Sequence, residues 1–258
     1  MADLYRALAP FYDSLNRDVD YHTWADFAEA CFQKYFPGKV ASVLDLACGT
    51  GSMTLELAAR GYDMIGVDAS PNMLSVAHAR AGAAGLADRI LYLCQDMCDF
   101  ELYGTVEAVV CCLDAVNHIT DRAALSRCFH WVHNYLVPDG LFLFDVNSPY
   151  KFEHVYGDRA YLLEEEGVLC AWQNDYRPAS HTCDFYISLF TEDEDGRYTR
   201  QDACQRERMY TLRSLRRLLQ ENGLAFVAAW GDFNFGEPRD DCERYYIAAR
   251  AVKGDPVL

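Results

Sequence analysis

The sequence Val-Leu-Asp-Leu-Ala-Cys-Gly-Thr-Gly at residues 43–51 predicts a buried β-strand that ends in a tight turn. Its apolar residues suit a strand that is covered on both faces, as in a parallel sheet. Gly49 and Gly51 allow the backbone to turn sharply and to approach a ligand closely, where a Cβ would intrude. Residues 54–60 are predicted to be helical, so the turn points the positive end of a helix at the ligand.

Asp45 indicates the charge of that ligand. A turn that binds a dinucleotide has the pattern G-x-G-x-x-G, but Thr54 occupies the position of the third glycine. A carboxylate four residues before Gly49 would also repel a pyrophosphate and attract a cation. The expected ligand is therefore a positively charged nucleoside, and S-adenosylmethionine fits that description.

Residues 45–51 resemble the first motif of the class I S-adenosylmethionine-dependent methyltransferases, an acidic residue followed by a G-x-G turn. The resemblance implies a Rossmann-like fold and S-adenosyl-L-methionine as the cofactor. The alternative is an ordinary strand-to-helix turn in another kind of α/β protein.

Composition and charge narrow the class of protein. The formal net charge of −16 argues against nucleic acid as a substrate, because phosphates would be repelled over much of the surface. The one basic cluster, Arg213–Arg217, is more simply a solvated helix face. Eleven cysteines without a C-x-x-C pair indicate buried thiols in a reducing cytoplasm. No apolar run has the length of a membrane span, and residues 1–10 lack the features of a signal peptide.

Strand and helix patterns alternate through the first part of the chain. Strands are expected at 40–46, 62–67, 90–94, 106–112 and 140–146, and helices at 51–60, 71–84 and 121–136. Such alternation predicts a parallel sheet with helices on both faces and with ligands at the carboxyl ends of the strands.

The pattern changes at either end of this α/β region. Residues 1–38 are predicted to form an N-terminal helical lid. Residues 39–147 and 211–258 are assigned to a Rossmann-like domain with a seven-stranded, mostly parallel sheet, closed by an antiparallel edge hairpin near 224–230 and 244–251. Residues 148–210 are predicted to form an antiparallel β insertion, which is the expected acceptor-binding region.

Acidic residues follow two further strands. Asp68 ends the second strand, where a carboxylate can accept both hydroxyls of a ribose; the competing role, capping the next helix, is better filled by Ser70. In the family that the motif resembles, an aspartate at the position of Asp96 receives the adenine amino group. The resemblance implies a cofactor-binding set of Asp45, Ala47, Cys48, Gly49, Gly51, Asp68, Ala69, Met73, Gln95, Asp96, Met97, Leu113 and Trp24.

Two residues are candidates for catalysis. The opening of the chain resembles a bacterial branch of the family that includes sugar N,N-dimethyltransferases, in which a lid tyrosine and a histidine after the fourth strand line the reaction centre. By position these roles fall to Tyr12 and His118, although core packing explains Tyr12, and a strand-end contact explains His118, about equally well. Helix packing likewise competes with a lining role for Trp24. No metal is expected, since His130 and His133 lack a third ligand.

The sequence thus predicts a cytoplasmic methyltransferase that acts on an amine or hydroxyl of a small molecule, without a membrane partner. The alternatives are an RNA or protein methyltransferase, or a protein that binds S-adenosylmethionine without transferring its methyl group. No pattern in the chain specifies an oligomeric state or identifies the acceptor.

Overall fold

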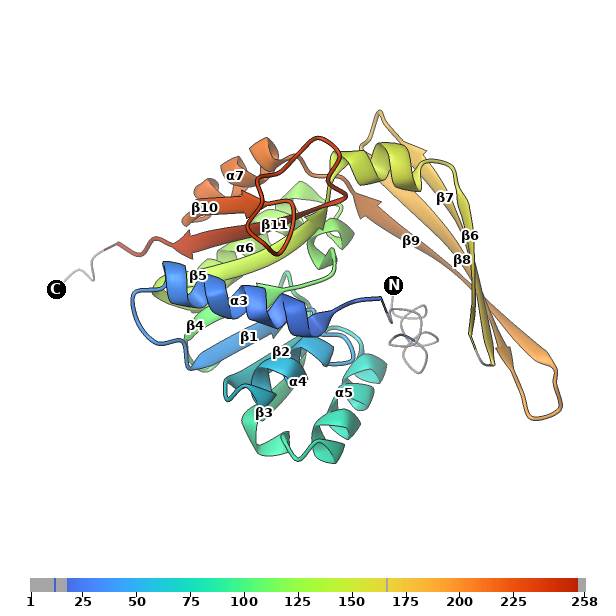
Figure 1. Ribbon diagram of the computed structural model, residues 1–258, viewed down its shortest axis with the longest axis horizontal. Coiled ribbons are helices and arrows are strands. Elements are labelled where there is room, and N and C mark those ends of the chain that lie inside the picture. The colour runs from blue at the N-terminus through green and yellow to red at the C-terminus, as the bar shows by residue number, and fades with distance from the viewer. Residues whose placement is uncertain (1–11, 13–17, 166, 255–258) are drawn as a thin grey trace.

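The computed structural model describes residue 12, residues 18–165 and residues 167–254. A seven-stranded sheet has the order β10-β11-β5-β4-β1-β2-β3 (Figure 1). Its strands are β1 (Ser42–Leu46), β2 (Asp63–Asp68), β3 (Ile90–Cys94), β4 (Val106–Cys111), β5 (Leu136–Asn147), β10 (Leu224–Trp230) and β11 (Arg244–Ala251). The first five are parallel, and β11 pairs antiparallel with both β5 and β10. This arrangement confirms the predicted Rossmann-like fold and its antiparallel edge hairpin.

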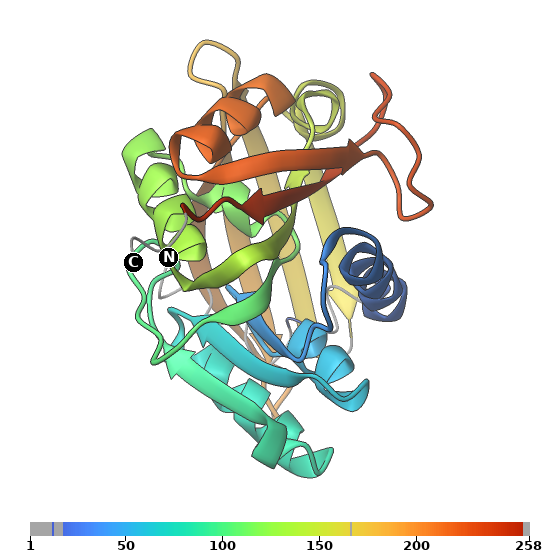
Figure 2. The same ribbon diagram turned by 90° about the vertical axis from the view of Figure 1, so that its left-hand side faces the viewer.

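Helices cover both faces of this sheet (Figure 2). They are α3 (Tyr21–Tyr35), α4 (Ser52–Ala59), α5 (Pro71–Ala83), α6 (Arg122–Tyr135) and α7 (Leu212–Glu221). Apolar residues of α3 and α4 pack with one set of strand side chains, and those of α6 and α7 pack with the other set. Both sides of the parallel strands are therefore buried, which explains their nearly continuous apolar runs. Of the predicted N-terminal lid before α3, the described residues are Tyr12, which is helical, and residues 18–20, which are not.

Most of these helices begin at a side-chain cap that can be recognised in the sequence. Asp20, Ser70, Asp121 and Thr211 accept the backbone N–H groups of α3, α5, α6 and α7, respectively. Ser70 thus fills the capping role predicted for it. Helix α4 is different, because it begins at Gly51 in the left-handed conformation and has no side-chain cap. Its first N–H groups are left for other partners at the end of β1.

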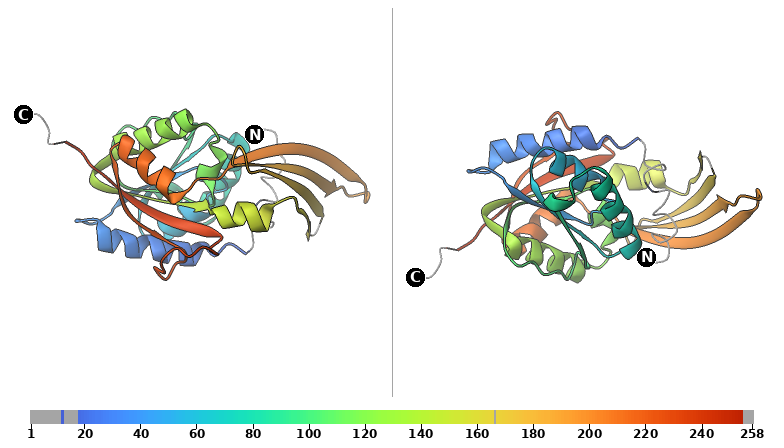
Figure 3. Two further views of the ribbon diagram at one scale, coloured as in Figure 1. Left: turned by 90° about the horizontal axis from the view of Figure 1, so that it is seen from above. Right: turned by 90° about the horizontal axis from the view of Figure 1, so that it is seen from below.

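A second, antiparallel sheet is inserted between β5 and α7. It consists of β6 (Ala160–Glu165), β7 (Val168–Arg177), β8 (Thr182–Glu192) and β9 (Tyr198–Arg208), in that order. Figures 1 and 3 show it projecting from one end of the seven-stranded sheet, with the π-helix η3 (Lys151–Tyr156) at its base. The expected antiparallel strands are present, whereas η3 was not predicted.

No described helix combines the length and the apolar character needed to cross a membrane.

Candidate active site

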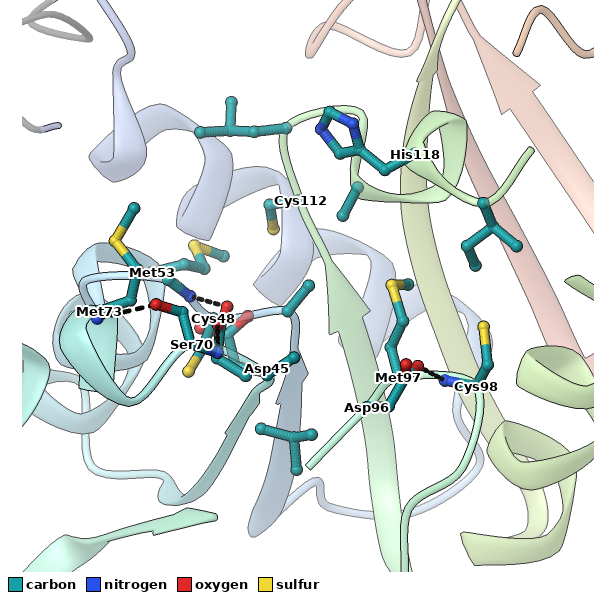
Figure 4. A pocket seen from close by; sticks show the side chains of 18 of the residues that line it. Asp45, Cys48, Met53, Ser70, Met73, Asp96, Met97, Cys98, Cys112 and His118 are labelled. Carbon is teal, nitrogen blue, oxygen red and sulfur yellow. Dashed lines mark hydrogen bonds between the residues drawn. The ribbon is translucent and has the colours of Figure 1, made fainter. Parts of the chain in front are cut away.

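A cavity of about 490 Å³ lies at the carboxyl ends of β1, β2 and β4 (Figure 4). Strand β1 lies between β4 and β2 in the sheet. The chain leaves β1 toward β2 and β3 on one side and later returns to β4 on the other side, so the strand order reverses beside β1. In open α/β sheets, such a switch in strand order creates a crevice where ligands bind.

The turn between β1 and α4 forms the floor of the cavity. Ala47, Gly49 and Gly51 all have positive φ angles, of 60°, 55° and 79°. A Cβ added to Gly51 would lie 2.5 Å from the Tyr92 hydroxyl, so only glycine fits there. The Arg80 guanidinium donates hydrogen bonds to the Thr50 carbonyl (3.1 Å) and to Ser52 Oγ (2.8 Å). The contacts with Tyr92 and with Arg80 therefore fix the path of the turn.

Asp45 lies beneath this turn and is 1% exposed. The Thr54 hydroxyl donates to its Oδ2 at 2.5 Å. Burial raises the pKa of Asp45 to about 7, and the nearby Asp68 adds to the shift. A cationic ligand in the cavity would favour the ionised carboxylate, which is the interaction predicted from the sequence.

Asp68 links the ends of β1 and β2. Its Oδ2 accepts the Gly49 N–H (2.9 Å), and its Oδ1 accepts the Ser70 N–H (2.8 Å). Burial raises the pKa of Asp68 in spite of these two bonds. Each carboxylate oxygen has two lone pairs, so positions remain for hydroxyl donors such as those of a ribose.

The residues after β3 divide between the cavity and its surroundings. Asp96 and Met97 line the cavity, and Asp96 Oδ1 accepts the Cys98 N–H at 2.7 Å. Gln95 does not line it, because both polar atoms of its side chain bond to the backbone of Glu101. On the opposite side of the cavity, Met73 lies beside Met53 (Figure 4).

His118 lines the end of the cavity that faces the second sheet (Figure 4). It ends the short helix η2 (Ala115–His118), which follows β4 through two positive-φ residues, Leu113 (56°) and Asp114 (52°). Asp145 accepts the N–H groups of both, at 2.7 Å and 3.0 Å, and pairs with Arg244. Burial lowers the pKa of His118, although Asp114 opposes the shift. The imidazole is therefore neutral near pH 7.

The cavity brings together most of the residues predicted from the sequence. Those that line it are Tyr12, Asp45, Ala47, Cys48, Gly49, Asp68, Ala69, Met73, Asp96, Met97, Leu113 and His118. Gly51, Gln95 and Trp24 do not. Trp24 is 2% exposed and packs edge-on against Phe27 and Tyr246, as a core residue of α3.

Other lining residues were not predicted as site residues from the sequence. Met53, Cys98, Cys112 and Arg127 also face the cavity. Met53 lies two residues after Gly51, in the first turn of α4, so its position in the sequence could have identified it as a lining residue. Arg127 reaches the cavity from α6, and only the packing of that helix against the sheet brings it there.

Comparison with known proteins decides the family. A family model described as a methyltransferase domain matches residues 43–140. The structure superposes with a TM-score of 0.85 on an S-adenosylmethionine-dependent methyltransferase from Clostridium acetobutylicum ATCC 824, which is 30% identical over 97% of this chain and 100% of that one. The chain belongs to the S-adenosylmethionine-dependent methyltransferases.

Further relatives of this methyltransferase are bacterial proteins. A Geobacillus sp. (strain WCH70) protein named as a methyltransferase is 28% identical over 246 residues, which are 95% of this chain and 99% of that protein. The dTDP-3-amino-3,6-dideoxy-alpha-D-glucopyranose N,N-dimethyltransferase of Streptomyces fradiae is 32% identical over 142 residues, which are 54% and 53% of the two chains. The methyl donor of this methyltransferase is S-adenosylmethionine.

The cavity suits this donor. Gly49 lines it, and a Cβ built there would meet nothing within 4 Å, so the backbone is open to close approach by a ligand. Buried carboxylates on β1 and β2 match a cationic nucleoside, and the uncapped start of α4 offers N–H donors.

Proposed function

We propose that this methyltransferase transfers the methyl group to an amine or hydroxyl of a small molecule. The observation that carries the proposal is the contact between the two sheets at His118. The side-chain amide nitrogen of Gln205, on β9, lies 2.6 Å from His118 Nδ1. The second sheet thus contacts the cavity through His118, which lines it, and this contact supports an acceptor site at the junction of the two sheets.

The donor would be held by residues at the ends of three strands. We assign Asp68 to the ribose hydroxyls, Asp96 and Met97 to the adenine, and Asp45 to the cationic part of the donor. When bound, S-adenosylmethionine supplies an electrophilic methyl group on a positively charged sulfur. The protein's task is then to exclude water and to align the acceptor with that group.

His118 and Tyr12 are the candidates for handling the acceptor. A neutral imidazole can accept a proton from an amine or a hydroxyl, and burial keeps His118 neutral. The Gln205 amide nitrogen contacts both ring nitrogens, at 2.6 Å from Nδ1 and 3.1 Å from Nε2. Tyr12 lines the same cavity and offers a phenolic hydroxyl as a second polar group.

The division of the chain into parts follows the same proposal. Residues 1–38 would act as a lid, residues 39–147 and 211–258 would bind the donor, and residues 148–210 would shape the acceptor pocket. The name of the Streptomyces fradiae relative contains an aminosugar, which supports a small acceptor. The net charge of −16 disfavours RNA, because phosphates would be repelled.

A screen of metabolite extracts with S-adenosylmethionine labelled on its methyl group tests this function. We expect label in small molecules that survive filtration, nuclease and protease treatment. Label confined to RNA or protein would contradict the proposal, and binding without any transfer would indicate a protein that only holds S-adenosylmethionine.

His118→Ala provides a second test. We expect turnover to fall about 100-fold or more, because general acid–base catalysis contributes on that order, with little change in donor affinity. His130→Ala, an exposed histidine of α6 outside the cavity, is the matched control and should leave turnover unchanged. Full turnover in the His118 variant would remove the residue from the mechanism.

A further inference from the structure

Charged side chains gather where the ends of β4 and β5 meet β9 of the second sheet. We define the junction cluster as Asp114, His118, Asp145, Lys151, Glu207 and Arg244. One ligand atom each of Asp114, His118 and Glu207 lies within 4.8 Å of the others. Because His118 also lines the cavity, the cluster adjoins the end where the acceptor is proposed to bind.

The charges within the junction cluster do not cancel. Arg244 pairs with Asp114 at 2.7 Å and also with Asp145. Glu207 is 5% exposed, and no ion pair within 4.0 Å joins it to a cation among the described residues. Lys151, the other cation, lies over the Tyr156 ring at 5.3 Å from its centre. With all three carboxylates ionised, they face two cations, which leaves one negative charge uncompensated.

Such a charge needs a partner, because burial disfavours it. Burial raises the pKa of Glu207 well above its ordinary value, and the nearby Asp114 raises it further. A proton on Glu207 would balance the charge of the cluster. A cationic ligand could take the place of that proton.

Asn147 provides an independent indication of a ligand. It is fully buried, and its Nδ2 donates to Glu207 Oε2 (3.2 Å) and to the Tyr156 hydroxyl (2.9 Å), so its amide group lies within the cluster. Its Oδ1 has no hydrogen-bond partner among the described residues. A buried oxygen left without a donor is destabilising, and an N–H group on a ligand would remove that cost.

We propose that the junction cluster binds a cationic ammonium group of the methyl acceptor, with Glu207 as the counter-charge and Asn147 Oδ1 as a hydrogen-bond acceptor. The inference rests on the proposed function, since it specifies the class of small molecule that is methylated. One uncompensated negative charge matches a monovalent organic cation better than a divalent metal ion. A metal ion would also lie beside the Arg244 guanidinium, which already pairs with Asp114.

Binding of a minimal probe to the protein saturated with S-adenosylhomocysteine tests the proposal. We expect n-propylammonium to bind in an NMR titration and 1-propanol, of the same length but uncharged, to bind at least tenfold more weakly. In Glu207→Gln the affinity for n-propylammonium should fall at least tenfold. Asp202→Asn is the matched control on the same strand, since Asp202 is 58% exposed and pairs with Arg200; its effect should stay within twofold.

Several outcomes would overturn the proposal. These are equal binding of the alcohol and the ammonium, unchanged ammonium binding in Glu207→Gln, and binding of Mn²⁺ that displaces n-propylammonium. Binding of S-adenosylhomocysteine also shows that Glu207→Gln is folded. If the variant does not bind it, the comparison of n-propylammonium with 1-propanol on the unchanged protein decides whether the cation site exists.

The two proposals can fail separately. Methylation of uncharged small molecules, together with no ammonium binding, would overturn the cation site and leave the proposed function intact. Label found only in RNA or protein would overturn the proposed function, whatever the probe does.

Discussion

At the scale of the residue, Asp68 combines two tasks in one carboxylate. It accepts the Gly49 N–H and the Ser70 N–H, and so it fixes both turns that border the cavity. Its remaining lone pairs can accept hydroxyl groups of the ribose assigned to it. Loss of this side chain therefore removes direct contacts and also loosens the backbone that makes others.

We predict that Asp68→Ala weakens S-adenosylmethionine binding by roughly ten- to a hundredfold, because hydrogen bonds to a charged group contribute about 1.5–3 kcal/mol. Calorimetric titration measures the change. Asp63→Ala is the control, since Asp63 begins the same strand but is 73% exposed and pairs with Arg89. An affinity loss in His118→Ala as large as that in Asp68→Ala would refute the division between donor-binding and catalytic residues.

Asp45 is expected to make donor binding depend on pH. In the ligand-free protein its pKa is about 7, chiefly because of burial, so a large fraction is protonated at pH 6. A cationic donor favours the ionised form, so binding requires loss of that proton. Affinity should therefore rise roughly tenfold from pH 6 to pH 8 and level off above that range.

Titrations at pH 6, 7 and 8 in buffers of different ionisation enthalpy would measure both the affinity and the proton released. Asp45→Asn should bind more weakly at pH 8 and should show a flat profile. A profile for the unchanged protein that is equally flat would show that Asp45 does not ionise on binding.

At the scale of the element, the sequence predicted most strands and helices but not the two short helices next to the site. Capping residues and apolar runs are local signals, so α5 and α6 were predicted to within about two residues of their observed bounds. The helices η2 and η3 depend on distant partners instead. Asp145 fixes the start of η2, and its hydrogen bonds join residues that lie more than 30 apart in the chain.

The candidate site was also predictable only where its residues depend on local patterns and on the sheet topology. Asp45 and Asp68 lie at the carboxyl ends of strands in a parallel sheet, so the topology alone brings them to one edge. Glu207 and His118 are adjacent only because β9 folds back over η2 from the second sheet, and no periodic pattern encodes that contact.

Strand β2 offers a direct test of packing beneath the turn. A Cβ added to Gly66 would lie 2.6 Å from Tyr92 Cδ1, on the neighbouring strand β3. We predict that Gly66→Ala lowers the free energy of unfolding by about 1–3 kcal/mol, as is usual when a packed core is overfilled.

Chemical denaturation of Gly66→Ala and Gly82→Ala would measure the effect. Gly82 is the matched control, because it lies in α5 with nothing within 4 Å of its Cβ position. Alanine there should stabilise the protein by about 0.5–1 kcal/mol. Loss of stability in the Gly82 variant, or none in the Gly66 variant, would contradict this account of β2.

At the scale of the whole molecule, the active site depends on how two sheets are joined. The seven-stranded sheet carries the cavity proposed to bind the donor, and β9 of the second sheet contacts the proposed acceptor end of that cavity at His118 (Figure 1). Asn117 connects the two. It is fully buried; its Nδ2 donates to the Arg208 carbonyl on β9 (2.8 Å), and its Oδ1 accepts the Asn147 N–H on β5 (2.9 Å).

We therefore predict that Asn117→Ala lowers the free energy of unfolding by about 2–4 kcal/mol, because it leaves a buried N–H and a buried carbonyl without partners. Hydrogen exchange should also accelerate at the end of β9, near Arg208, and far less in β1 and β2. Donor affinity should change little, since Asp45 and Asp68 lie on the other sheet, while turnover should fall as Gln205 loses its position against His118.

Asn134→Ala, on an exposed part of α6, should change none of these quantities. Uniform acceleration of exchange across both sheets would mean that they unfold as one unit and that Asn117 does not selectively hold the second sheet in place.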